Sequence, residues 1–97
     1  MITHIVCWKY KAETTAEERE GHMARLRALP EVIPDIDSFN VGSDILQLER
    51  SFDTGLVAVY PDRAALDFYT DHPAHQEVAA IGKRIAERVV SVDFIND

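Results

Sequence analysis

The chain has 97 residues, the length of one small domain, and its 46% apolar and 28% charged residues are ordinary globular composition. Its 17 acidic against 10 basic residues give a net charge of −7, which disfavours binding to nucleic acid or to an anionic membrane surface. A single cysteine excludes an internal disulfide and a four-cysteine zinc site, and is typical of a reducing compartment. No apolar run could cross a bilayer and no secretion signal is evident, so we expect one soluble, cytoplasmic domain over residues 1–97.

The first half of the chain predicts a strand, a helix and a second strand. Residues 2–10 are rich in β-branched and aromatic side chains, which favour a strand. Thr15-Ala16-Glu17-Glu18 has the spacing of a capping box and predicts the start of a helix. This helix is expected to end near Leu29, because Pro30 disfavours helical angles in the residue before it. The second strand is expected from Ile36 to Val41.

The second half predicts a strand, a helical region broken in the middle, and a last strand. Residues 51–60 form the expected third strand, and Pro61-Asp62 opens a helix. Pro73 suits the first position of another helix, because its missing N–H would be unpaired there. A terminal strand is expected around residues 90–94. One apolar stripe is expected along the last helix: Val78, Ile81, Ile85 and Val89.

The order β-α-β-β-α-β predicts an α+β, ferredoxin-like protomer, with a four-stranded antiparallel sheet and helices on one face. Two strands carry consecutive apolar residues, from Ile5 to Trp8 and from Leu56 to Tyr60, so both faces of the sheet are apolar. The uncovered face would exceed the roughly 400 Å² that a monomer tolerates. We therefore expect a homodimer in which two sheets pack face to face. In the alternative, residues 42–50 shield this face within one chain.

A group of polar residues near Pro73 is the first candidate for chemistry. If Pro73 is the first helical residue, His72 lies at the cap and His75 in the first turn, where the helix dipole favours a neutral imidazole that can act as a base. Tyr69 could stand beside His75 as a hydrogen-bond donor. His4 lies inside an apolar strand and needs a polar partner, either a side chain or a ligand.

The same residues also allow a structural interpretation. His72 and Asp71 can serve as helix caps, without contact to any ligand. The spacing of His72 and His75 could supply two metal ligands, but no third is evident, so no metal or other cofactor is expected. Cys7 is expected to be buried and unreactive, and His22, among charged residues, to be solvated.

Short segments of characteristic sequence occur from one end of the chain to the other: Thr3-His4-Ile5-Val6, Trp8-Lys9-Tyr10, Leu29-Pro30, Ile33-Pro34, Phe39 to Gly42, Arg50-Ser51-Phe52-Asp53, Tyr69, His72-Pro73-Ala74-His75-Gln76 and Val92-Asp93-Phe94. Together they resemble the stress-responsive dimeric A/B barrel (Dabb) domain. The resemblance implies a ferredoxin-like protomer whose sheets pair into a dimeric α+β barrel, which agrees with the expectation from the two apolar faces.

The family includes plant stress proteins and polyketide cyclases of the olivetolic acid cyclase type, which close a linear polyketide by an aldol condensation without a cofactor. On this resemblance His75 matches the base of that cyclase, Tyr69 its tyrosine and His4 a pocket histidine. Thr54 and Leu26 stand where the cyclase has a further histidine and a further tyrosine.

The sequence thus predicts a Dabb-like homodimer with a small apolar pocket for a small molecule. Its biochemical role stays open, and the resemblance implies a role in stress responses. One alternative is a cofactor-free lyase or cyclase acting on a β-carbonyl or aromatic compound. A second, cofactor-independent monooxygenation, rests on fold analogy alone. The expected catalytic residues are His75, Tyr69 and His4, and the expected substrate-binding residues are His72, Trp8, Thr54 and Leu26.

Overall fold

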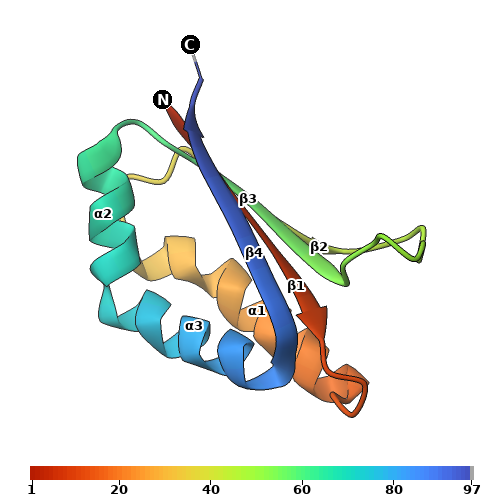
Figure 1. Ribbon diagram of the computed structural model, residues 1–97. Helices are drawn as coiled ribbons and strands as arrows, with labels where there is room; N and C mark the ends of the chain where they lie inside the picture. Colours follow the sequence, from red (N-terminus) through yellow and green to blue (C-terminus); the bar gives the residue numbers. More distant parts are fainter. Residues whose placement is uncertain (97) are drawn as a thin grey trace.

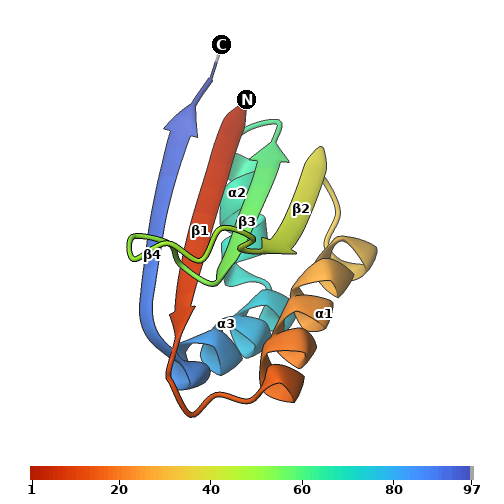
Figure 2. The same cartoon turned by 90° about the vertical axis from the view of Figure 1, so that its right-hand side faces the viewer.

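The computed structural model describes residues 1–96 and contains one four-stranded antiparallel sheet with three helices on one of its faces (Figure 1). The strands lie in the order β2-β3-β1-β4, as Figure 2 shows. This is the predicted ferredoxin-like arrangement, with the second helical region split in two. The elements are β1 (Ile2–Tyr10), α1 (Ala16–Val32), β2 (Ser38–Ser43), β3 (Thr54–Tyr60), α2 (Arg63–Asp71), α3 (Pro73–Ile85) and β4 (Ala86–Ile95).

The first helix begins as predicted but ends later. Thr15 accepts a hydrogen bond from the Glu18 backbone N–H (3.1 Å), and the Glu18 carboxylate accepts one from the Thr15 N–H (3.0 Å), which completes the capping box. The helix then continues through Pro30 to Val32. The expected end at Leu29 is wrong, because Pro30 removes one hydrogen bond while the Ile33 N–H still bonds to the Leu29 carbonyl (2.9 Å).

Three strand boundaries also differ from expectation. β2 begins at Ser38 and β3 at Thr54, each a few residues later than predicted. β4 begins at Ala86, so Val89 belongs to this strand and pairs with Trp8 of β1. The spacing of Val89 from Ile85 does not distinguish the two structures, because residues four apart lie on the same side of a helix and also on the same face of a strand.

His22 is buried in the core, so its predicted solvation is wrong. Its side chain is 1% exposed, and its ring packs edge-on against the rings of Trp8 and Tyr10. The Tyr10 hydroxyl and His22 Nδ1 are hydrogen-bonded at 2.8 Å. A Cβ at Gly82 of α3 would come within 3.0 Å of His22 Nε2, so the glycine permits this close approach of α1 and α3. The charged neighbours of His22 in sequence point in other directions around the helix.

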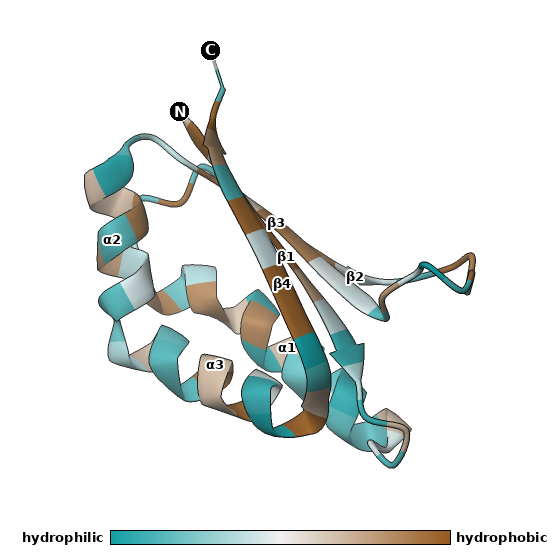
Figure 3. Cartoon of the chain, in the orientation of Figure 1, coloured by the Kyte–Doolittle hydropathy of each residue, from teal (hydrophilic) through white to brown (hydrophobic). Residues whose placement is uncertain are grey.

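The sheet face opposite the helices is apolar and uncovered within the chain. Its exposed members lie mainly on β4, whose apolar residues are visible in Figure 3. Cys7 lies on this face and is half-buried, so its expected full burial is wrong. The connection between β2 and β3 projects away from the helices (Figure 1), and seen from the outer side it crosses in front of β1 and β4 over only one part of this face (Figure 2). The large exposed apolar residues of this face are Val57, Val90, Val92 and Phe94.

The helices of residues 1–96 include none with the length and apolarity that a membrane span requires.

Candidate functional site

A trough runs along the helix-facing side of β1 and β4. Alternate residues of a strand point to the same face, so two neighbouring strands build the floor of the trough from facing pairs. One pair is polar, one is mixed and two are apolar. From the end nearest the termini, the pairs are Ile2 with Ile95, His4 with Asp93, Val6 with Ser91, and Trp8 with Val89.

The wall of the trough comes from α2 and α3. In Figure 1 these two helices and β4 form three sides of a triangle around it. α3 contributes His75, Ala79 and Lys83, which are four residues apart and therefore share one face of the helix. Because no helix packs over most of β4, its residues after Ala86 are exposed and the trough stays open along this strand.

The trough contains two connected spaces that share His4, Tyr69 and His75. The wider space, which we call the mouth, has a volume of about 580 Å³. The narrower one, the apolar chamber, has a volume of about 200 Å³ and lies further along α3. Besides the shared residues, the mouth is lined chiefly by Ile2, Arg63, Leu66, Asp67, Thr70 and Ile95. The chamber is lined by Val6, Trp8, Leu26, Leu56, Ala79, Lys83, Val89 and Ser91.

His75 has the features of a base. Its Nδ1 lies 3.0 Å from the Thr70 carbonyl oxygen, which can only accept, so Nδ1 carries the proton and the neutral ring has its lone pair on Nε2. Burial lowers the pKa of His75 below its usual 6.5. The hydrogen bond to Thr70 raises this pKa and the nearby His4 lowers it further, each by less than burial does. The ring is therefore neutral at pH 7 and above, with Nε2 free to take a proton.

Tyr69 lies directly beside His75, with ring centroids 4.4 Å apart. It is 1% exposed and lines both spaces. Burial raises the pKa of Tyr69 to about 12, so its phenol stays protonated at neutral pH. It can serve as a hydrogen-bond donor to an oxygen that develops negative charge.

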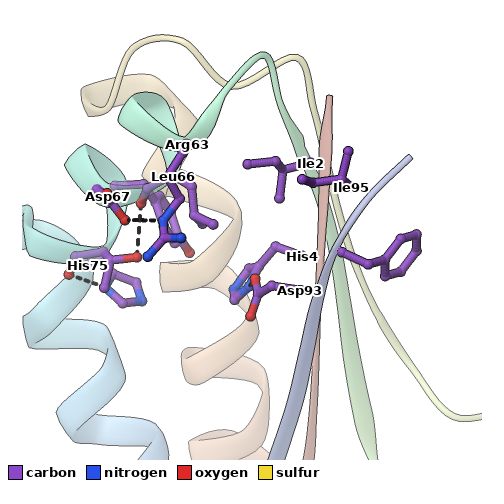
Figure 4. A pocket seen from close by; sticks show the side chains of 11 residues that line it. Ile2, His4, Arg63, Leu66, Asp67, His75, Asp93 and Ile95 are labelled. Atoms are coloured by element: carbon purple, nitrogen blue, oxygen red, sulfur yellow. Dashed lines mark hydrogen bonds and ion pairs between the residues drawn. The ribbon is translucent and has the colours of Figure 1, made fainter. Parts of the chain in front are cut away.

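His4 completes the polar part of the trough and has Asp93 as its partner. His4 Nδ1 and the Asp93 carboxylate are hydrogen-bonded to each other across β1 and β4. Figure 4 shows both side chains on the sheet, facing His75 and the Arg63–Asp67 pair across the mouth. Asp93 was not among the expected site residues. Asp93 lies opposite His4 because of the register of β1 and β4, and the sequence alone does not give this register.

The other expected site residues divide into two groups. Trp8 and Leu26 line the apolar chamber. His72 is the cap between α2 and α3, where its ring accepts a hydrogen bond from the Ala74 N–H (3.0 Å), as the structural interpretation anticipated. Thr54 is buried beside a separate space of about 420 Å³, near the β2–β3 connection. The structure therefore brings five of the seven predicted residues together.

Within residues 1–96, no three His, Cys, Asp or Glu side chains are grouped so that they could hold a metal ion. The His4–Asp93 pair on the sheet faces His75 on α3 across the mouth. Acid–base chemistry by side chains is what this arrangement supports.

Solved structures of the same fold come from bacteria and plants. A dimeric ferredoxin-like protein of unknown function from Thermobifida fusca is 26% identical over 98% of this chain and 90% of that chain, with a TM-score of 0.89. A similar dimeric protein of unknown function from Jannaschia sp. is 25% identical over 98% of each chain, with a TM-score of 0.83. Hydroxynitrile lyase from Passiflora edulis is 18% identical over 99% of this chain and 93% of that chain, with a TM-score of 0.89, and this likeness concerns the fold alone.

No curated protein is significantly similar to the chain in sequence. The model of the stress responsive A/B barrel domain (Dabb), however, matches residues 2–96, which is nearly the whole chain. The chain therefore belongs to the Dabb family.

Proposed function

We propose that this protein is a homodimer that binds a small carbonyl compound in the trough and acts on it as a cofactor-free lyase or cyclase. The observation that carries the proposal is the state of His75, whose Nδ1–H is bonded to Thr70 while Nε2 remains free inside a cavity. A base held in one tautomer can remove a proton from the carbon next to a carbonyl group, and a buried phenol beside it can stabilise the negative charge that develops on the oxygen.

The proposed step involves one proton and no external reagent. His75 Nε2 takes a proton from the carbon next to the carbonyl. The electron pair of that C–H bond forms a C=C bond, and the π electron pair of the C=O bond moves onto the oxygen, which gives an enolate. The Tyr69 phenol donates a hydrogen bond to this oxygen, and the His4–Asp93 pair lies within the same mouth. In a cyclisation, the enolate carbon then bonds to a second carbonyl carbon of the same molecule, and the alkoxide that results takes the proton from the His75 imidazolium. Without a second carbonyl, the enolate itself takes that proton back.

The comparisons support the class of reaction only by analogy. A hydroxynitrile lyase has this fold, so the fold is compatible with lyase chemistry. The family description associates the domain with stress responses, and we include a stress-related role in the proposal. We also place the protein in the cytoplasm, because its lone cysteine suits a reducing compartment.

The homodimer follows from the uncovered sheet face. Val92 is 52% exposed and Phe94 44%, and both lie on β4 beside the outer face of β1. Two such faces packed about a two-fold axis would bury the patch in both copies. The similar proteins from Thermobifida fusca and Jannaschia sp. are described as dimeric, which supports this assembly.

Deuterium exchange into a simple ketone tests the proposed chemistry without knowledge of the natural substrate. 2-Octanone offers a carbonyl for the histidines and an apolar tail for the chamber. In D₂O at pH 7.5, we expect the protein to accelerate exchange next to the carbonyl, with a rate that saturates as the ketone concentration rises. NMR of the ketone measures the exchange. A rate no greater than that of free imidazole at the same concentration would contradict the proposal.

A further inference from the structure

Lys83 has an unusual position in the trough. Among the residues described, it is the one Lys, Arg, Asp or Glu that lines the apolar chamber. The ion pairs formed within residues 1–96 do not include it. In a chain with a net charge of −7, a cation at the edge of an apolar space and without a carboxylate partner suits a negatively charged ligand.

The other charged groups of the trough already have partners. Arg63 Nε donates to the Asp67 carboxylate at 2.9 Å in the mouth, and His4 is paired with Asp93. Burial lowers the pKa of His75 and leaves its ring neutral, and the opposing effect of the hydrogen bond to Thr70 is smaller. An anion that enters the trough is therefore attracted most strongly by the Lys83 ammonium.

The spacing along α3 sets the length of the ligand. Lys83 follows His75 by eight residues on the same face, which corresponds to roughly 12 Å along the helix. The long lysine side chain can shorten this span by several ångströms. A chain of about six bonds between a carbonyl carbon and a carboxylate carbon would bridge the remaining distance, and a volume of about 200 Å³ can hold such a chain.

We propose that the trough selects medium-chain oxo acids, with the carboxylate at Lys83 and the carbonyl between Tyr69 and His75. This inference rests on the proposed function, because it assigns the carbonyl to the same histidine. Lys83 is then a residue that determines substrate specificity and takes no part in proton transfer. In the competing arrangement, the Lys83 stem only covers apolar surface and its ammonium stays in water.

The fluorescence of Trp8 can measure binding directly, because it is the single tryptophan of the chain and lines the chamber. The probes are 7-oxooctanoate and its methyl ester, which differ in the negative charge and in one methyl group. We expect the dissociation constant of the acid to be roughly fivefold lower than that of the ester, as for a partly exposed charge pair. This difference should shrink in 0.5 M NaCl, because salt screens the attraction.

Substitutions at Lys83 and its neighbour assign the effect. Lys83→Gln should make the dissociation constants of the acid and the ester equal, while Lys83→Arg should keep most of the preference. Arg84→Gln is the matched control, because Arg84 is an adjacent, exposed cation of α3 that does not line the chamber. It should leave the preference unchanged.

The possible failures are distinguishable. Equal binding of acid and ester by the unmodified protein, or a preference that survives Lys83→Gln, overturns the role of Lys83 and leaves the proposed function standing. If neither probe binds and 2-octanone exchange is also absent, the trough is not a ligand site and both proposals fail.

Discussion

Replacing His75 by alanine is expected to slow the exchange of 2-octanone at least about 100-fold, the usual contribution of a positioned base. The substitution removes the ring whose Nε2 is the base of the proposed step from the lining that the mouth and the chamber share. The loss of stability should be modest: among residues 1–96, the substitution removes one hydrogen bond, to the Thr70 carbonyl, and the ring contact with Tyr69. The measurement is the exchange rate by NMR, with the melting temperature checked in parallel.

His72→Asn is the matched control for that experiment. His72 precedes Pro73 and acts through its cap hydrogen bond to the Ala74 N–H, which asparagine can replace. The exchange rate of this variant should stay within a factor of two or so of the unmodified protein. Unchanged exchange in His75→Ala would remove His75 from the proposed mechanism, whatever the control shows.

Replacing Val92 by glutamate is expected to separate the dimer into monomers. Val92 lies in the middle of the exposed apolar face of β4, opposite Ile5 of β1. In a two-fold interface the substitution places two carboxylates in an apolar contact, and burying unpaired charges costs several kcal/mol. Sedimentation at micromolar concentration should give twice the 11.0 kDa of one chain for the unmodified protein, and 11.0 kDa for the variant.

Val32→Glu tests whether any new charge would have the same effect. Val32 is 60% exposed at the end of α1, away from the sheet face, so this variant should remain dimeric. An unmodified protein that sediments as a folded 11.0 kDa species would contradict the homodimer. A Val92→Glu variant that stays dimeric would place the interface on another surface.

Local signals in the sequence predicted most of the fold. The capping box at Thr15, the proline at position 73 and the apolar runs of β1 and β3 depend on residues close together in the chain. Boundaries were wrong where two local preferences compete. Pro30 can end a helix or occupy its last turn, and Val89 fits the stripe of α3 as well as the inner side of β4.

The site was predictable only in part, for a related reason. His75 and Tyr69 are six residues apart on consecutive helices, so their sequence spacing already suggested that they meet. Asp93 approaches His4 through the register of β1 and β4, across 89 residues of chain. Lys83 becomes notable only because it lines the chamber and forms no ion pair within residues 1–96, and His22 because of the glycine that faces it. Such features depend on tertiary packing.

The central claim is that His75 at neutral pH is an uncharged ring, protonated on Nδ1 and unprotonated on Nε2. ¹⁵N NMR of the histidine rings tests it most directly, because the two nitrogens give different resonances in each tautomer. Since burial lowers the pKa of His75, we predict that at pH 7.5 its Nε2 resonates as an unprotonated nitrogen, and that the ring becomes half-protonated only at a pH below the usual pKa of histidine. An imidazolium, or a proton on Nε2 at pH 7.5, would contradict the claim.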